Sequence, residues 1–333
     1  MTALAIWRKD YTEGLHVDFL DHLTPALICQ LFFILSAAAV LAVAFTPPST
    51  RQLLIQYGAR SSSSARNSHE AQRDHDDVGA KQDKFTRLIS CVTSVGNVPH
   101  SWFMHFYVLS ISSSVFWAFQ FMCRGSILNG IAKSQTAVSS AAATMSINQV
   151  FLTWLMMLMQ GGRRLYEHLA IIRPSSSKMW VVHWLLGCAY YLCIGVSIWV
   201  EGSRSILYYN RRFSHVEAPS LNELVGLVLF LFGWSMQYRC HKYLSSLRKY
   251  SFPEEGMFRF LICPHYTCEC LLYLSIAITA APKDQWYNQT LMCGLLFVSV
   301  NLGVTARGTK TWYVEKFGTE KVEGRWLMIP LVY

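Results

Sequence analysis

The chain has 333 residues, of which 52% are hydrophobic and only 15% are charged. Soluble domains carry about 25% charged residues, so the composition indicates a membrane protein and excludes an ordinary soluble domain. The formal net charge of +9 does not indicate nucleic-acid binding, because the basic residues are scattered between apolar segments and form no separate basic domain.

Seven apolar segments approach the length of about 20 residues that a helix needs to cross a bilayer. In chain order they are residues 24–46, 101–122, 136–159, 180–200, 221–237, 264–281 and 287–305. The second and third are the least apolar, since small polar residues interrupt them, although such residues also suit a seam between helices. We therefore predict an all-α, polytopic membrane protein with about seven transmembrane helices.

The connections between these segments differ in charge. With the N-terminus in the lumen, most of the 29 Lys and Arg residues fall on the cytoplasmic side. The positive-inside rule therefore predicts a lumenal N-terminus and a cytoplasmic C-terminus. Residues 47–85 contain four consecutive serines and mixed charges, which is typical of a flexible cytoplasmic insertion. We expect residues 1–100 to hold the first span and this loop, and residues 101–333 to form the main membrane domain.

Polar residues cluster where the fifth span ends and the sixth begins. Gln237 and His241 close one apolar segment, and His265 and Glu269 open the next. Burying such groups near hydrocarbon costs several kcal/mol unless they are paired, so a functional site is the first hypothesis. A purely structural polar contact between helices is the alternative.

The cysteines near this region do not predict a metal centre. Cys263, Cys268 and Cys270 surround His265, but zinc sites usually combine two closely spaced ligand pairs, and no second pair is present. Small apolar packing residues in a helix explain these thiols better. We therefore expect no metal cofactor.

Four short blocks lie in and between the later spans. They read NVP with FMHFY within residues 97–107, RRLYE at 163–167, QYRCH with LRK within 237–249, and PHY with a following glutamate at 264–269. Together they resemble the polyprenol reductase branch of the steroid 5α-reductase family. The second and third blocks are specific to that branch, and the fourth is common to the wider family. Read alone, the RRLYE block is an ordinary helix end, in which Arg163 and Glu167 pair four residues apart.

The resemblance implies NADPH as cofactor, bound within residues 237–333. A dinucleotide held without a glycine-rich turn needs side-chain donors for its amide and hydroxyls and cations for its phosphates. Arg248 suits a phosphate, and His265 stands where the family has asparagine, so it keeps one hydrogen-bond donor. The implied cofactor-binding residues are Gln237, His241, Arg248, Tyr250, His265, Glu269 and Tyr313.

The resemblance also locates the reacting end of the substrate. Steroid-reducing relatives polarise a carbonyl with a Tyr–Glu pair, and here Gln160 and Asn97 stand at those two positions. An amide cannot donate a proton as an acid, but it can hold an oxygen that gains negative charge. The proton donor is therefore open between Tyr166, His105 and a water molecule.

The resemblance also predicts the reaction and its place. Hydride adds to a carbon–carbon double bond only if the remaining charge has a sink, which favours polyprenal over polyprenol as the direct substrate. We therefore expect a multi-pass endoplasmic reticulum enzyme that contacts the bilayer and a long polyisoprenoid and supplies dolichol for protein glycosylation. The alternatives are a steroid 3-oxo-4-ene reductase, a membrane isoprenoid or isoprenylcysteine methyltransferase, and a non-enzymatic lipid-binding or transport protein.

Overall fold

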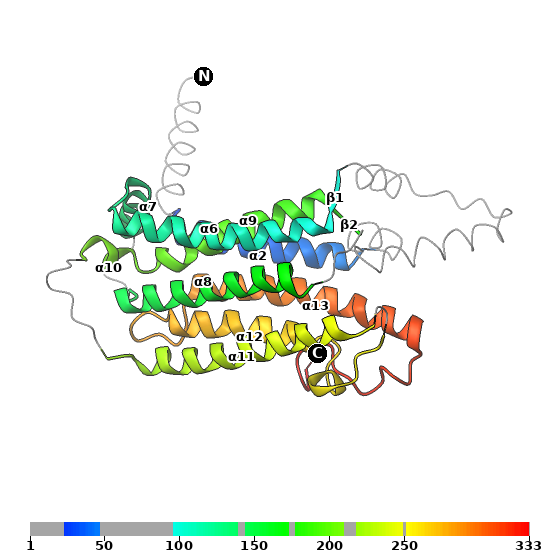
Figure 1. Ribbon diagram of the computed structural model, residues 1–333. Helices are drawn as coiled ribbons and strands as arrows, with labels where there is room; N and C mark the ends of the chain where they lie inside the picture. Colours follow the sequence, from blue (N-terminus) through cyan, green and yellow to red (C-terminus); the bar gives the residue numbers. More distant parts are fainter. Residues whose placement is uncertain are drawn as a thin grey trace, which may run out of the picture.

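Long helices account for most of the structure. The computed structural model describes residues 23–46, 96–138, 144–172, 177–209, 218–248 and 251–332. Among these, the helices of 16 residues or more are α2 (Pro25–Ala44), α6 (Phe103–Met122), α8 (Ile147–Ala170), α9 (Val181–Val200), α11 (Leu221–Ser246), α12 (Pro264–Thr279) and α13 (Gln289–Phe317). They lie along a common axis as one bundle (Figure 1).

Short elements lie at the two ends of the bundle (Figure 1). At one end are α7 (Ser126–Val138) and α10 (Ser203–Leu207). At the other, β1 (Asn97–Pro99) pairs antiparallel with β2 (Lys178–Trp180) and joins the start of α6 to the start of α9. The turns η1 (His100–Trp102) and η2 (Gly256–Arg259) complete the described elements.

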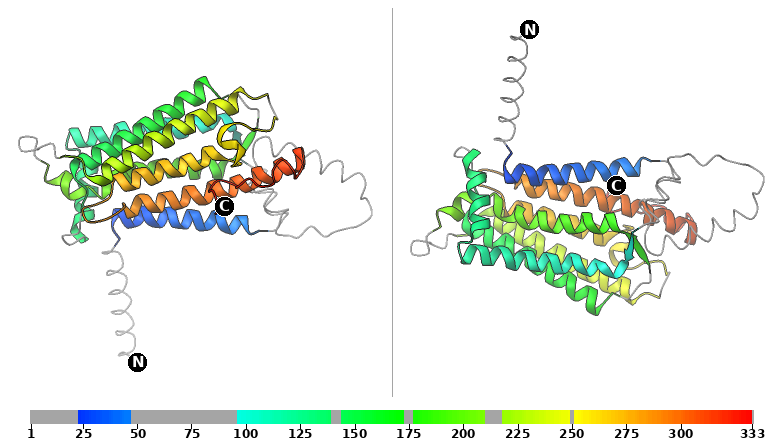
Figure 2. Two further views of the ribbon diagram at one scale, coloured as in Figure 1. Left: turned by 90° about the horizontal axis from the view of Figure 1, so that it is seen from below. Right: turned by 90° about the horizontal axis from the view of Figure 1, so that it is seen from above.

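Helices that are far apart in the sequence lie side by side. The first described helix, α2, packs along the last, α13, as the two views of Figure 2 show. Helices α11 and α12 pack closely because Gly226 of α11 has no side chain. A Cβ atom there would lie 2.8 Å from the Ser275 carbonyl oxygen of α12. At the other end of the same pair, Gln237 of α11 contacts His265 and Glu269 of α12, so the polar ends of the fifth and sixth predicted spans lie together.

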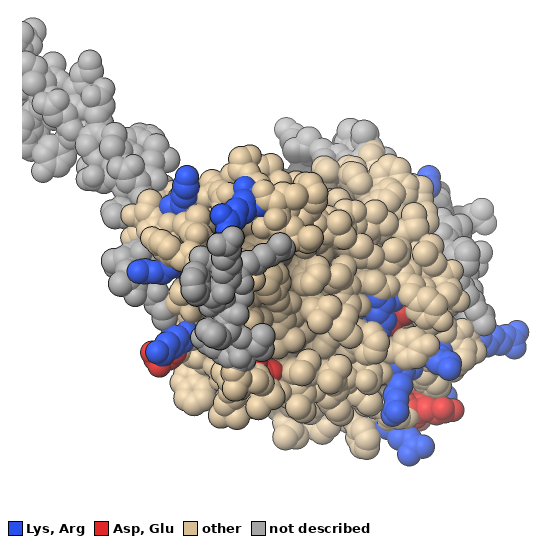
Figure 3. All heavy atoms as spheres, turned by 60° about the vertical axis from the view of Figure 1, so that its left-hand side comes forward, with Lys and Arg blue, Asp and Glu red and all other residues tan. Residues whose placement is uncertain are grey.

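The bundle has an apolar interior and an apolar exterior. Phe33, Ile194, Trp199, Phe230 and Leu291 are buried in one continuous core. The outer surface also carries large apolar side chains, and one face shows a broad uncharged region with charged residues towards its borders (Figure 3). Exposed apolar patches of this extent mark a surface that meets lipid or another apolar partner. By length and composition, α2, residues 100–122, α9 and α13 can each cross a membrane.

The predicted spans do not all coincide with single helices. The third, at 136–159, covers two elements, because α7 ends at Val138 and α8 begins only at Ile147. Ser146 starts α8 with a capping box that includes Gln149, so the polar stretch interrupts the helix. The fifth and seventh predicted spans end inside longer helices, since α11 continues to Ser246 and α13 to Phe317.

Helices α11 and α13 both extend past the apolar segments from which the spans were predicted. The polar end of α11 carries site residues, and the end of α13 packs against the C-terminal segment. Helix α12 agrees closely with the sixth span and begins at a proline. The number of membrane spans and the orientation of the termini stay predictions. The loop at 47–85 lies outside the described residues.

The C-terminal segment folds back over the start of α12. The Ile262 N–H donates to the Trp326 carbonyl at 2.8 Å, and the Cys263 N–H donates to the Leu327 carbonyl at 2.9 Å. The Thr267 hydroxyl donates to the Met328 carbonyl. A second, smaller core forms beneath this segment, with Phe252, Ile262, Cys263, Ala306, Tyr313, Val322, Leu327 and Met328. The first turn of α12, where His265 lies, is thereby held from two sides.

Candidate active site

Helix α8 carries four polar residues on one face near its C-terminal end. Gln160, Arg163, Arg164 and Glu167 are spaced by three and four residues, which places them on neighbouring turns. Glu167 is fully buried, with an exposed fraction of 0%. A carboxylate in that position is stable only if it is paired and hydrogen-bonded. The predicted pair of Arg163 and Glu167 is confirmed.

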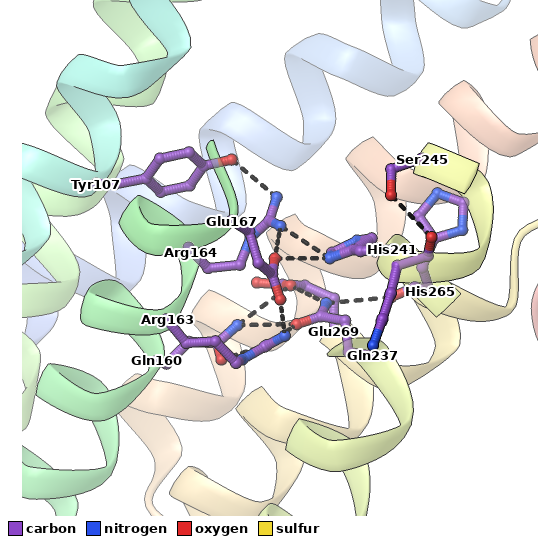
Figure 4. Close-up of polar contacts among 11 residues, drawn as sticks. Tyr107, Gln160, Arg163, Arg164, Glu167, Gln237, His241, Ser245, His265 and Glu269 are labelled. Carbon is purple, nitrogen blue, oxygen red and sulfur yellow. Dashed lines mark hydrogen bonds and ion pairs between the residues drawn. The ribbon is translucent and has the colours of Figure 1, made fainter. Parts of the chain in front are cut away.

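Glu167 holds three groups from two helices. One carboxylate oxygen accepts from Arg163, and the other accepts from Arg164 and lies 2.7 Å from Nδ1 of His241. His241 comes from α11, so this buried acid joins α8 to α11 (Figure 4). The two arginine side chains are thus fixed in position rather than extended into solvent.

Gln237 connects the same network to α12. Its amide oxygen accepts from Arg163 and, at 3.1 Å, from Nε2 of Gln160. Its amide nitrogen donates to the carboxylate of Glu269 and, at 3.2 Å, to the carbonyl of His265. Opposite ends of the amide therefore meet a cation and an anion, and this fixes its orientation. The Gln160 amide also donates to Glu269, at 3.4 Å.

A tyrosine from α6 completes the cluster. Nη2 of Arg164 donates to the Tyr107 hydroxyl at 2.8 Å, and the guanidinium carbon lies 5.0 Å from the centre of the Tyr107 ring. The tyrosine is buried and is 5% exposed. Figure 4 shows its hydroxyl pointing towards Arg164 from across the site.

The site is therefore electrically balanced. Arg163 and Arg164 supply two positive charges, and Glu167 and Glu269 supply two negative charges, all within one connected network. Balance of this kind lowers the cost of keeping charges away from water. It also means that the arginines are engaged by protein carboxylates.

Two nitrogen atoms in this cluster have no partner. Nδ1 of His265 and Nε of Arg163 are inaccessible to solvent and make no hydrogen bond to any described residue. An unsatisfied buried polar group costs roughly 1–3 kcal/mol. Each of these atoms could form a hydrogen bond with a polar group placed next to it.

The structure brings together five of the predicted site residues. Gln160, Gln237, His241, His265 and Glu269 all lie in the cluster, with the rings of His241 and His265 centred 5.6 Å apart. The cluster extends beyond the predicted stretch at 237–333, since α6 and α8 both contribute to it.

Three predicted catalytic residues lie elsewhere. Asn97 is exposed on β1, and Tyr166 lies on the outer side of α8 with 55% of its surface exposed. His105 packs against Trp102 and Trp184, with ring centres 5.1 and 5.9 Å away. None of the three joins the hydrogen-bonded network just described.

Two of the remaining predicted cofactor residues, Arg248 and Tyr313, lie outside the hydrogen-bonded cluster. Arg248 is exposed just beyond the end of α11. Tyr313 packs in the smaller core, with ring centres 5.0 Å from Phe252 and 5.9 Å from Phe317. Tyr250 lies outside the described residues. Among the described residues, no group of three or more His, Cys, Asp or Glu side chains is arranged to hold a metal ion.

Comparisons with known proteins show which family the chain resembles. Residues 177–333 match the family described as 3-oxo-5-alpha-steroid 4-dehydrogenase. Polyprenal reductase 2 of Oryza sativa subsp. japonica is 24% identical over 287 residues, which cover 71% of this chain and 79% of the relative. The polyprenal reductase of Homo sapiens is 24% identical over 244 residues, covering 66% and 74%. That of Saccharomyces cerevisiae is 30% identical over 171 residues, covering 51% and 60%.

The resemblance to the polyprenal reductase branch of the steroid 5α-reductase family is confirmed. The family match spans α9 to α13 and so includes the Gln237, His241, His265 and Glu269 part of the site. The α8 and α6 residues precede the matched part, and the structure joins them to it.

Proposed function

We propose that this protein is an oxidoreductase that uses NADPH to saturate the α-isoprene double bond of polyprenal, giving dolichal. One observation carries the proposal: a buried, charge-balanced network with two unpaired nitrogens, in a chain similar to polyprenal reductases. Arg163 and His265 each keep an unsatisfied buried atom, which is available to a polar group of a bound ligand.

The residues of the cluster fit a nicotinamide cofactor. His265 offers an unpaired ring nitrogen and Glu269 offers a carboxylate acceptor, which suit an amide and a ribose hydroxyl respectively. Arg248, exposed beyond α11, suits a phosphate. When bound, NADPH supplies the hydride. The protein contributes the orientation of that group and the exclusion of water from the network.

The chemistry of the substrate favours an aldehyde. A double bond conjugated to a carbonyl accepts hydride because the oxygen takes up the charge, and an allylic alcohol has no such sink. Gln160 lies within the cluster and its amide is able to hold that oxygen. The long isoprenoid tail matches the apolar outer faces of the helices, because it can remain in lipid throughout.

We place the enzyme in the endoplasmic reticulum membrane, where its product would supply dolichol for protein glycosylation. With the C-terminus in the cytoplasm, the ends of α8 and α11 and the start of α12 face the compartment that contains NADPH. This orientation rests on the distribution of Lys and Arg between the apolar segments.

Ligand binding by the purified protein tests the proposal first. In detergent, NADPH should raise the melting temperature and S-adenosylmethionine should not, because a ligand stabilises the folded state that binds it. Stabilisation by S-adenosylmethionine alone would favour the methyltransferase alternative instead.

Turnover then tests the substrate. NADPH oxidation should be measured in parallel with polyprenal, polyprenol and a 3-keto-4-ene steroid, with products identified by mass spectrometry. We expect polyprenal to be reduced and the other two to be nearly inert. Saturation of polyprenol without any aldehyde would overturn the argument from conjugation, and turnover of the steroid alone would overturn the substrate class.

A further inference from the structure

The proposed reaction requires a proton as well as a hydride. After the β carbon of the enal has received the hydride, negative charge is shared by the α carbon and the carbonyl oxygen, and the α carbon must then be protonated. Gln160 and Asn97 are amides and cannot act as acids. Tyr166 is 55% exposed, and His105 packs between Trp102 and Trp184, so neither reaches the network.

The other ionisable groups of the cluster are poorly suited to donate a proton. Glu167 accepts from two arginines and contacts His241, and Glu269 accepts from two amides, so both carboxyl groups act as hydrogen-bond acceptors. Two carboxylates balance two arginines. A proton added to His241 or His265 would place a further positive charge beside that pair of arginines, which is unfavourable.

Tyr107 is the exception. Its hydroxyl oxygen accepts from Nη2 of Arg164 at 2.8 Å, while no described residue accepts the hydrogen of that hydroxyl. The ring is buried and lies 5.0 Å from the same guanidinium. A phenol in this setting has a free proton to give and an adjacent cation to stabilise the phenolate that remains.

We propose that Tyr107 donates the proton to the α carbon of the substrate, and that Arg164 stabilises the resulting phenolate. This inference rests on the proposed function. The O–H bond of Tyr107 breaks as a C–H bond forms at the α carbon, and the electron pair held there returns to restore the carbonyl. Water then reprotonates Tyr107. With the hydride from NADPH, the substrate gains one hydride and one proton.

Glu167 and His241 act on this step through Arg164. Glu167 accepts from Nη1 of Arg164, which leaves Nη2 directed at the Tyr107 hydroxyl. Nδ1 of His241 lies 2.9 Å from the same Nη1. These two are positioning residues, because they fix the cation that contacts the proton donor.

The substitution Tyr107→Phe tests the proposal, since it removes one hydroxyl and keeps the buried ring. We expect turnover of polyprenal to fall about 10²- to 10⁴-fold. The rise in melting temperature with NADPH should be unchanged, because the hydroxyl is not assigned to the cofactor. Tyr166→Phe makes the same change on the exposed side of α8 and should leave turnover as in the natural protein.

A nitroalkene of the same isoprenoid skeleton separates proton donation from a structural role. Hydride addition to it leaves a nitronate, which is stable in water and is protonated after release. Tyr107→Phe should therefore reduce the nitroalkene at the rate of the natural protein while failing on polyprenal. Equal loss on both substrates, or unchanged turnover of polyprenal, would overturn the proposal. Failure of the natural protein to reduce polyprenal would overturn the proposed function instead.

Fluorotyrosine at position 107 covers the case in which phenylalanine prevents folding. The groups facing this side chain are Arg164, whose guanidinium contacts its hydroxyl, and His168, whose ring centre lies 5.9 Å from its own. Glu167, Glu269 and Tyr191 also act on it electrostatically. Fluorination makes the phenol more acidic with little change in size. The alkaline fall in polyprenal turnover should therefore shift to lower pH, and an unmoved profile would contradict the assignment.

Discussion

Gln237 shows how much the site depends on single side chains. Its amide meets Arg163 and Gln160 of α8 through the oxygen, and Glu269 of α12 through the nitrogen. The amide therefore links the arginine and glutamine side chains of α8 to the carboxylate of α12. Polar residues in a low-dielectric bundle end act strongly on one another, because little water is present to screen them.

Loss of the buried carboxylate should have a large effect on stability. Glu167→Gln keeps the size of the side chain but leaves Arg163 and Arg164 with one fewer negative charge. Breaking a buried ion pair from one side costs about 3–5 kcal/mol. We expect a clear fall in the melting temperature in detergent.

A surface carboxylate provides the control for that change. Glu254 pairs with Lys321 at 3.5 Å, and both side chains are more than half exposed. Glu254→Gln should cost about 1 kcal/mol or less. Equal shifts for the two variants would contradict the buried network around Glu167.

Cofactor binding should be more sensitive than folding to the α12 residues. His265→Ala removes the unpaired ring nitrogen, and Glu269→Gln removes a negative acceptor. A lost hydrogen bond of roughly 1–3 kcal/mol corresponds to an affinity about 5- to 150-fold lower. NADPH titration followed by melting temperature or fluorescence measures this change.

A polar contact at the far end of the bundle serves as the control. Nε2 of Gln30 in α2 donates to Thr290 of α13 at 2.9 Å. Gln30→Leu should leave NADPH affinity unchanged. Normal affinity in both α12 variants would show that the cofactor does not contact this cluster.

At the scale of the elements, four helices deliver the site from the same end of the bundle. Tyr107 lies near the start of α6, His265 and Glu269 near the start of α12, and the α8 and α11 residues near the ends of those helices. The sequence predicted the α11 and α12 portion, because polar residues beside apolar segments are costly unless used.

The α6 and α8 portion could not be recognised in the same way. A pair of arginines with a glutamate four residues on is also what an exposed helix end carries. Only the packing of α11 and α12 against α8 shows that Glu167 is buried. In the sequence, Tyr107 cannot be distinguished from an ordinary aromatic residue at a membrane interface. Its contact with Arg164 depends on the packing of α6 against α8.

The close packing of α11 on α12 depends on one glycine. Gly226→Ala would bring a Cβ atom to 2.1 Å from the Thr279 hydroxyl oxygen and 2.8 Å from the Ser275 carbonyl oxygen. Relieving this contact requires the α12 backbone to move away from α11, which costs free energy. We therefore expect a lower melting temperature and weaker NADPH binding. Gly130→Ala on α7, where nothing lies within 4 Å, should be neutral or stabilising by up to about 1 kcal/mol. Similar behaviour of the two variants would exclude a tight α11–α12 contact.

For the whole molecule, the prediction that matters is which side the site faces. Ser246 is exposed at the end of α11, on the predicted cytoplasmic side. Ser246→Cys in sealed microsomes should react with an impermeant thiol reagent added from outside. Cys123, exposed after α6 at the opposite end, should react only after detergent is added. The reverse pattern would invert the topology and separate the site from cytoplasmic NADPH.

The contact between α2 and α13 has a consequence for biogenesis. The first described helix packs along the last, so its partner is made only near the end of synthesis. At translation rates of about 5–20 residues per second, the wait is on the order of tens of seconds. During that time α2 can pack only against elements made earlier, such as α9, which it also contacts. It is the most apolar of the four helices able to span a membrane, which suits a segment whose α13 side faces lipid until the chain is complete.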